Sequence, residues 1–320
     1  MNSVFSMPKW SPFQARLFAP LKPYMTAANN ITDAALGLTW TYCEVQLDSG
    51  EVSLGLAQTS GEATRTLPWS GSIQGKPVAE IAPWLTEFQG LEATLALAAM
   101  NALINTWNNP LCVEATRLEQ GNLAVFEHFK AKLARQKVVV IGRYPGLEKV
   151  LDGINYQVLE RRPGPGDLPD SACEQVLPEA DWVFITGTSL INHTLLRLCE
   201  LSERAVTVLM GPSVPWLPDW AKLHVDFIAG VQVLDAAMAK QVAKEGGGTR
   251  MFDEAVVYQV ANISGERLQH LKAQIAETWA QREALKASAS SPSDLKQLEV
   301  VDAKLSRLDS AYKRLWDAQS

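Results

Sequence analysis

The sequence of 320 residues lacks several features that would point to a particular class of protein. Its four cysteines and four histidines are scattered, so neither a disulfide framework nor a local zinc motif is present. Acidic side chains outnumber basic ones by 35 to 29, which disfavours a nucleic-acid partner because phosphate neutralisation dominates that affinity. No apolar run approaches the ~20 residues of a membrane span, and the amino terminus does not resemble a signal peptide. We expect a cytoplasmic protein without a nucleic-acid partner or a membrane span.

The composition is that of a globular protein, with 47% hydrophobic and 20% charged residues and no low-complexity tract. The length allows two domains, each with its own core. Apolar alternating runs on either side of the turn at 48–51 predict a hairpin, and an alanine-rich apolar segment at 86–105 predicts a buried helix. We therefore expect a small α+β domain over residues 1–115, which begins with a short arm broken by Pro20 and Pro23.

Apolar strands that stop at glycine define the middle of the chain. The clearest are Val138–Gly146, Asp181–Thr194 and Val206–Pro215, and shorter apolar runs lie at 156–159 and 227–231. Strands that are apolar on both faces are typical of a parallel sheet covered by helices, and here they alternate with helical segments. We expect a doubly wound, Rossmann-like α/β domain over residues 116–262. Ligands of such sheets bind beyond the carboxyl ends of the strands.

The last part, residues 263–320, has a helical pattern. Apolar residues form two stripes, with Leu268, Leu271, Ile275 and Trp279 in the first and Leu295, Leu298, Val301, Leu305, Leu308, Tyr312 and Leu315 in the second. The segment 287–294 separates them, and Ser293 or Asp294 is able to cap the second helix. We expect a helical hairpin that either packs on its own chain or serves as an arm for a homodimer or a protein partner.

The turn after the first strand of the predicted sheet is a candidate anion site. Gly142 ends the strand and Pro145 follows in GRYPG, but the GxGxxG fingerprint of dinucleotide-binding sheets is missing. The amides of this turn either hold an anion or form only a tight connection to a helix. Glu160 ends the second strand, where it either binds a ribose or substrate or pairs with Arg161 or Arg162.

Other single residues give weaker signals. Asp167 projects from the proline- and glycine-rich loop 163–169, which is either functional or merely connective. Asp167, Glu160 and His193 are weak candidates for metal ligands, although a lone histidine on a helix is more often a packed or surface residue. The glycine-rich segment 245–249 either covers a ligand or links two elements.

The segment TGTSLIN carries the most specific polar pattern in the chain. Around Gly187, where strand becomes helix, stand Thr186, Thr188, Ser189 and Asn192. Helix capping explains one or two of these side chains but not all four, whereas a phosphate, a carboxylate or a metal-bound ligand would suit the whole array. The next strand ends in a similar turn, formed by Gly211, Pro212 and Ser213. These two turns form the principal candidate binding site.

Several motifs in order resemble those of a family described as a putative heavy-metal chelation domain: IGxxPG, PGxGDxP, ADWVFITGTSLIN, GPSxPxxP, AGVxVxD and EGGG. GLTWTYCEV, GLAQT, LPWSG and LAAMNALIN resemble the companion domain usually found ahead of it. Over residues 32–260, the resemblance implies an enolase amino-terminal-like module joined to a Rossmann-like module, with a site at their junction. Around that site it places Gly142, Tyr144, Pro145, Glu160, Asp167, Thr186, Gly187, Thr188, Asn192, Gly211, Pro212, Ser213, Asn101 and Asn105. The chain departs from the family pattern at Tyr144, where phenylalanine is expected, and in its helical tail.

Three functions fit these residues. The favoured one is the binding of a small anionic ligand or a metal chelate at the domain junction, in metal handling, because hydrogen-bonding groups converge there and catalytic groups do not. The second is an enzyme that uses a nucleotide-type cofactor in the Rossmann crevice. The third is a metal-cofactor assembly or delivery protein that docks a partner through the helical hairpin. No catalytic residue is assigned, and the only cofactor indicated is a metal ion or metal chelate.

Overall fold

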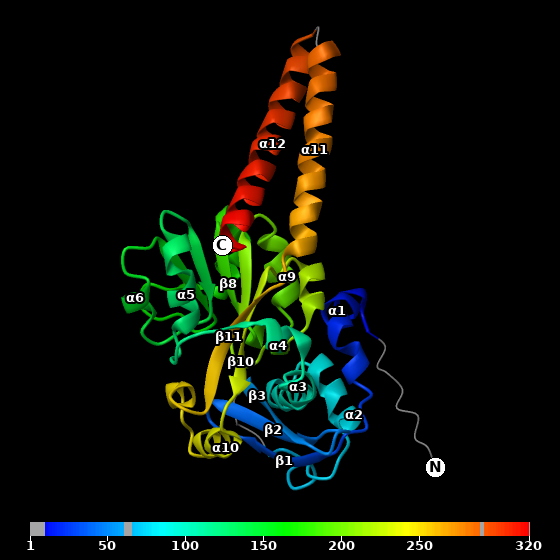
Figure 1. Cartoon of the computed structure of the whole chain (residues 1–320), viewed down its shortest axis with the longest axis vertical. Helices are drawn as coiled ribbons and strands as arrows, with labels where there is room; N and C mark the ends of the chain where they lie inside the picture. Colours follow the sequence, from blue (N-terminus) through cyan, green and yellow to red (C-terminus); the bar gives the residue numbers. More distant parts are fainter. Residues whose placement is uncertain (1–9, 61–65, 289–290, 320) are drawn as a thin grey trace.

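The amino-terminal part is an antiparallel three-stranded meander covered by helices (Figure 1). The computed structural model describes residues 10–60, 66–288 and 291–319 of the chain. The strands are β1 (Ile31–Leu36), β2 (Trp40–Gln46) and β3 (Val52–Gln58). The helices are α1 (Pro12–Leu17), η1 (Ala19–Tyr24), α2 (Val78–Ile81), η2 (Ala82–Thr86), α3 (Gly90–Ile104) and α4 (Pro110–Glu114). The predicted hairpin is β2–β3, and the predicted buried helix is α3, which begins four residues later than expected.

Local sequence explains how these elements begin and pack. Ser11 caps α1 in a capping box with Gln14. Gly50, with φ of 86°, takes the left-handed position of the β2–β3 turn. Gly55 allows the closest packing, since a Cβ at this position would lie 2.1 Å from the carbonyl oxygen of Ala98. Helix α3 can therefore lie directly on β3, and it is buried almost all round.

The middle of the chain forms an eight-stranded sheet in the order β4-β11-β10-β9-β8-β5-β6-β7. Its strands are β4 (Thr116–Arg117), β5 (Val138–Ile141), β6 (Tyr156–Glu160), β7 (Leu168–Pro169), β8 (Trp182–Thr186), β9 (Val206–Met210), β10 (Phe227–Val233) and β11 (Val256–Asn262). The run from β7 to β10 is parallel and has the order 3-2-1-4-5-6 of a Rossmann sheet. The prediction missed β11, which pairs antiparallel with both β10 and β4.

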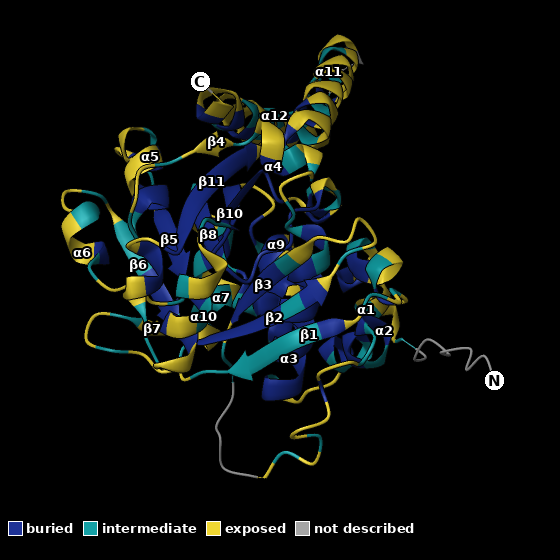
Figure 2. Cartoon of the chain, turned by 60° about the horizontal axis from the view of Figure 1, so that its bottom comes forward, coloured by how far each residue is buried: buried dark blue, intermediate teal, exposed yellow. Residues whose placement is uncertain are grey.

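Both faces of this sheet are covered, as the apolar strands predicted. Alternate residues of each strand point to opposite faces, so Val139 and Ile141 enter one hydrophobic core while Val138 and Val140 enter another. The first core extends to α3 and the second to the inner face of α5 (Figure 2). The helices of this part are α5 (Ala124–Leu133), α6 (Leu147–Val150), η3 (Asp170–Ala172), α7 (Cys173–Val176), η4 (Leu177–Glu179), α8 (Thr188–Ile191), α9 (Leu195–Leu201), η5 (Pro218–Leu223), α10 (Ala236–Lys244) and η6 (Thr249–Phe252).

The carboxyl-terminal part is the predicted helical hairpin, formed by α11 (Gly265–Ser288) and α12 (Pro292–Gln319), which projects from the body at the end opposite the meander (Figure 1). Two details of its prediction were wrong. Trp279 and Leu295 are more than half exposed instead of lying in the apolar stripes. Ser291, rather than Ser293 or Asp294, caps α12, and Asp294 bonds back to the amide of Ser291. No helix in the described ranges is both long and apolar enough to cross a bilayer.

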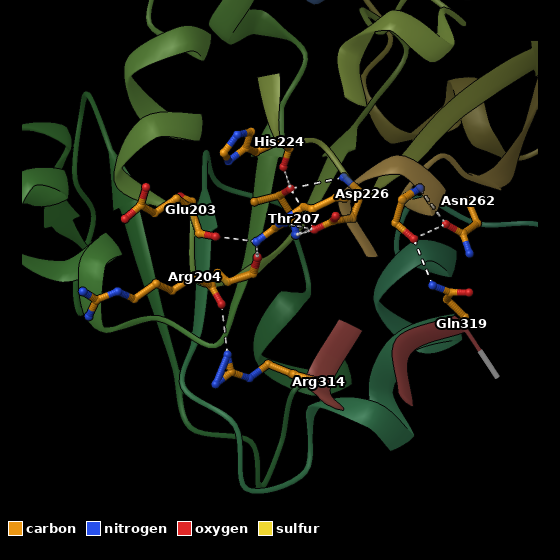
Figure 3. Close-up of polar contacts among 12 residues, drawn as sticks. Glu203, Arg204, Thr207, His224, Asp226, Asn262, Arg314 and Gln319 are labelled. Atoms are coloured by element: carbon orange, nitrogen blue, oxygen red, sulfur yellow. Dashed lines mark hydrogen bonds and ion pairs between the residues drawn. The ribbon is translucent and has the colours of Figure 1, made fainter. Parts of the chain in front are cut away.

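Buried polar contacts fix the root of the hairpin at the amino ends of the parallel strands (Figure 3). Arg267 pairs with Asp226, whose side chain is fully buried and also accepts a hydrogen bond from the amide of Thr207 at 2.9 Å. Arg314 pairs with Asp181 at 2.8 Å and donates to the carbonyl of Arg204 at 3.1 Å. Because these partners belong to the sheet domain, the hairpin is anchored to the body at its base.

Candidate functional site

A cavity of about 490 Å³ lies between the meander and the carboxyl ends of the parallel strands. Strands β5 and β8 are neighbours at its centre, and from them the chain continues to β6 on one side and to β9 on the other. This is the switch point at which doubly wound sheets bind their ligands. The cavity is lined by Thr39, Trp40, Gln58, Thr59, Ser60, Asn122, Gly142, Arg143, Tyr144, Pro145, Glu160, Arg161, Thr186, Thr188, Asn192, Gly211, Pro212, Ser213, Gly248, Thr249, Phe252 and Tyr258.

Most of the residues singled out from the sequence line this cavity. The structure thus brings together the turns after β5, β8 and β9 and the end of β6, which are far apart in the sequence. Ser189 is buried and does not line the cavity. Five other singled-out residues do not line it either: Asp167, Gly187, Asn101, Asn105 and His193. Their contacts, described below, give four of them structural roles around the cavity and place His193 away from it.

Glu160 closes the end of β6 against the first turn. Its Oε2 accepts the amide of Arg143 at 2.9 Å, and its Oε1 accepts the amide of Arg161 at 2.7 Å. The carboxylate therefore holds the Gly142 turn to the neighbouring strand. Gly142 itself has φ of 95°, and a Cβ there would contact Thr186 at 3.4 Å, so this turn needs glycine for its backbone conformation.

Among the described residues, the side chain of Arg161 has a neutral partner and no carboxylate. Its Nη1 donates to Oδ1 of Asn192 at 2.9 Å. Asn192 also contacts Ser60 of the meander at 3.5 Å. Arginine presents several donors in a planar fork, so one used by Asn192 leaves others for an anion. This pairing was not foreseen, because the sequence suggested Arg161 and Arg162 as partners of Glu160.

Arg143, by contrast, is neutralised. Its Nε and Nη2 donate to the two oxygens of Asp167 at 3.0 Å each, a bidentate ion pair. The side chain of Asp167 is only 5% exposed and also accepts the amide of Gly164. The expectation that Asp167 projects from its loop was therefore wrong. Asp167 instead fixes Arg143 at the edge of the cavity.

The hydroxyl groups of the two principal turns face one another and the meander. Thr186 and Thr188 contact each other at 3.1 Å through their Oγ1 atoms. Ser213 Oγ accepts the amide of Gln58 at 2.8 Å, which ties the turn after β9 to β3. Gly187 lies behind them, where a Cβ would come within 3.0 Å of Ser213. Gly187 thus permits the close approach of these turns rather than contacting the cavity.

Aromatic side chains form another part of the wall. The Tyr144 hydroxyl is buried, and burial raises the pKa of this phenol. Burial also raises the pKa of Tyr258, and the nearby Tyr144 adds to the effect. Both phenols are therefore neutral donors at physiological pH. Trp40 of the meander donates its indole NH to the carbonyl of Gly248 at 2.8 Å, which places the glycine-rich segment 245–249 over the cavity.

Asn101 and Asn105 lie behind the cavity on α3. Asn101 donates to the carbonyl of Leu56 at 2.8 Å, and Asn105 donates to the carbonyl of Val214 at 3.0 Å and accepts the amide of Trp216 at 2.9 Å. These amides hold the chain after β9 against the meander. They support the wall of the cavity from the outside, so any effect on a ligand would be indirect.

His193 has a packing role. Its Nε2 lies 2.8 Å from the carbonyl oxygen of Leu85, and its ring contacts Phe18 and Phe88. Burial lowers the pKa of this imidazole, and the bond to Leu85 offsets part of the effect. The other ring nitrogen, Nδ1, is buried without a hydrogen-bond partner among the described residues, so the one polar contact of this packed ring is the carbonyl of Leu85.

The described residues do not offer a site for a directly bound heavy metal. No three histidine, cysteine, aspartate or glutamate side chains gather among them in a way that could hold an ion. Soft metals prefer thiolates, but Cys43, Cys112 and Cys199 are buried, and burial raises the pKa of each thiol, to about 12 for Cys112 and Cys199. These three thiols are therefore protonated at neutral pH.

Comparison with known proteins places the chain in a family. Residues 124–262 match the model of the DUF364 family and residues 20–104 match that of a companion family, both described as "Putative heavy-metal chelation". The chain belongs to this family. Both ranges contribute residues to the cavity, since the first contains the sheet and the second contains the meander.

Three known proteins resemble the chain over most of its length. An uncharacterized protein of Methanocaldococcus jannaschii is 27% identical over 233 residues, which are 70% of this chain and 87% of the relative. A crystal structure of a DUF364 protein of unknown function from Desulfitobacterium hafniense has 25% identity and a TM-score of 0.68, over 78% of this chain and 98% of that one. One from Pyrococcus horikoshii has 22% identity and a TM-score of 0.65, over 78% and 99%. These likenesses agree with the α/β fold, whereas the enolase-like kinship of the meander and the domain boundaries stay predictions.

Proposed function

We propose that the cavity binds a small anionic ligand, including a metal chelate that arrives with its own donor atoms. The family description points to metal handling, while the described side chains provide no cluster of metal ligands. A chelate whose organic part is recognised by hydrogen bonds reconciles the two. The cavity volume of about 490 Å³ is within the usual range for small-molecule sites, about 300–1,000 Å³.

The observation that carries this proposal is the state of Arg161. It lines the cavity, and its side-chain partner is the neutral amide of Asn192 at 2.9 Å. Glu160, the neighbouring carboxylate in the lining, has both of its oxygens engaged by backbone amides. A carboxylate or phosphate that entered the cavity would therefore find guanidinium, hydroxyl and phenol donors to satisfy it.

Ligand retention and ligand specificity test the proposal together. Protein purified without chelators or a metal-affinity column would be examined by native mass spectrometry and elemental analysis. Its melting temperature would then be measured with citrate, ferric citrate, phosphate and NAD. We expect citrate or its iron complex to raise the melting temperature through selective binding to the folded state. Binding of NAD with no effect of the carboxylates would favour an enzyme with a nucleotide cofactor, which the Rossmann strand order also suits.

A pair of neighbouring arginines provides the control. Arg161→Gln keeps a hydrogen-bonding group but removes the cation, and we expect affinity to fall about 10- to 100-fold, as for loss of a charge-assisted hydrogen bond. Arg162 does not line the cavity, so Arg162→Gln should bind as the wild type does. Equal effects of the two substitutions would contradict the proposed role of Arg161.

A further inference from the structure

A groove of about 700 Å³ lies at the root of the hairpin. It lies between one flank of α11 and α12 and the segments around Arg204 and His224 of the sheet domain. The ligand cavity is at the carboxyl ends of the parallel strands, whereas this groove is at their amino ends, beside Asp226 and Ala205. The groove is therefore a separate surface, and both family ranges end before the hairpin begins.

The groove is a cationic surface on an acidic protein. Five lysine and arginine side chains line it against two carboxylates, although the whole chain has a net charge of -6. Arg267 and Lys222 are committed to Asp226 and Asp219. Three other cations, Arg204, Lys304 and Arg307, are exposed and form no ion pair with a carboxylate of the described residues.

An apolar floor runs beneath these cations. Leu271 and Ala311 are less than one tenth exposed, and Leu308 is half-buried beside them. Val300, which is 67% exposed, continues the floor toward the tip of the hairpin. Apolar contact stabilises a bound protein segment but does little for a phosphate polyanion, which is recognised mainly by charge.

The groove is also preformed, because the contacts that fix the hairpin root do not depend on a partner. Arg267 reaches the carbonyl of Ala205 at 3.1 Å in addition to Asp226, and Gln319 near the end of α12 donates to Ser264 at 3.1 Å (Figure 3). A rigid surface has less conformational entropy to lose on binding.

We propose that this groove is a docking site for an acidic, amphipathic segment of a partner protein. From Val300 to Ala311 the groove follows α12 for about 16 Å, the length of about five extended residues. Glutamate or aspartate side chains of the segment pair with Lys304 and Arg307 at the rim, and its apolar side chains cover Leu271 and Leu308. The hairpin thereby adds a protein partner to a chain whose ligand cavity is elsewhere.

Fluorescence anisotropy tests this proposal with a labelled peptide of about ten residues, composed of glutamate and leucine, and with a counterpart that has glutamine for glutamate. We expect micromolar binding of the acidic peptide only, which weakens as salt increases because charge contributes to it. Lys304→Glu with Arg307→Glu should weaken binding at least about tenfold, and so should Val300→Asp alone. All three positions are exposed, so the variants should fold, which circular dichroism would verify.

The matched control is Lys272→Glu with Lys313→Glu, which reverses two exposed charges of the hairpin outside the groove. It should leave peptide affinity unchanged. An equal loss in this control, no binding of the acidic peptide at micromolar concentration, or displacement of the peptide by inorganic polyphosphate at lower concentration would each overturn the proposal. A dimer in sedimentation velocity that the groove variants dissociate would also overturn it in favour of a second copy of the chain. None of these outcomes bears on ligand binding at Arg161.

Discussion

The buried pair of Arg267 and Asp226 should control the stability of the hairpin root. The Asp226 side chain is 0% exposed and that of Arg267 is 9% exposed, so neither is well solvated. In Arg267→Met, Asp226 would keep its bonds to Thr207 but lose its counter-charge, and the carbonyl of Ala205 would lose a donor. Removal of one partner from a buried ion pair costs about 3–5 kcal/mol. That is a large part of the ~5–15 kcal/mol that stabilises a typical folded protein.

Urea unfolding followed by circular dichroism measures this cost. With a slope of ~3 kcal/mol per molar urea, the midpoint should fall by about 1 M or more. Adding Asp226→Asn to Arg267→Met should restore part of the loss, because asparagine keeps an acceptor for the Thr207 amide without an uncompensated charge. The exposed pair of Arg197 and Glu174 is the control, and Arg197→Met should leave the midpoint unchanged. A stable Arg267→Met protein, or a double variant no more stable than the single one, would refute this reasoning.

Three further predictions concern other parts of the chain. Gly187→Ala should weaken ligand binding in the same melting assay, because its Cβ would push against Ser213, which lines the cavity. Burial lowers the pKa of His193 in the folded protein below its usual 6.5. On acidification the unfolded chain therefore takes up a proton at a higher pH than the folded chain does, and the free energy of unfolding should fall as the pH drops below ~6.5. His193→Gln, which can still donate to Leu85, should lessen that fall in pH-dependent urea unfolding. In the native protein, a thiol reagent should label Cys173 first, since it is the one cysteine of four that is not buried.

The strands of the sheet were predictable because burial on both faces demands continuous apolar runs. Val138–Ile141 and Trp182–Thr186 have such runs, and the structure confirms their place in the sheet. Strand β11 was missed because its pairing with β10 and β4 is set by neighbours that the sequence does not reveal. The exposure of Trp279 has a local reason. Trp279 lies four residues after Ile275, and this step carries its side chain beyond the packed face of α11. Thr278, which lies three residues after Ile275, occupies the buried position instead.

The polar ends of the strands could also be predicted, since parallel strands bring their carboxyl ends to one edge. What the sequence could not show was which side chains meet across the two parts of the chain. Ser213 bonds to Gln58 from 155 positions away, and Trp40 reaches Gly248 from 208 positions away. Asp167 was expected to project from its loop, but the bidentate contact with Arg143 holds it against the body.

Strand β11 joins two places that have been described separately. Tyr258 lines the ligand cavity, and Asn262, at the end of the same strand, holds Ser264 immediately before α11. About 13 Å of strand separates these residues, whereas α11 is about 36 Å long. A small rotation at the root therefore produces a larger movement at the other end: a tilt of about 5° displaces the far end of α11 by about 3 Å. A spin label at an exposed position of α11, away from its root, would measure whether the hairpin moves when a ligand enters the cavity.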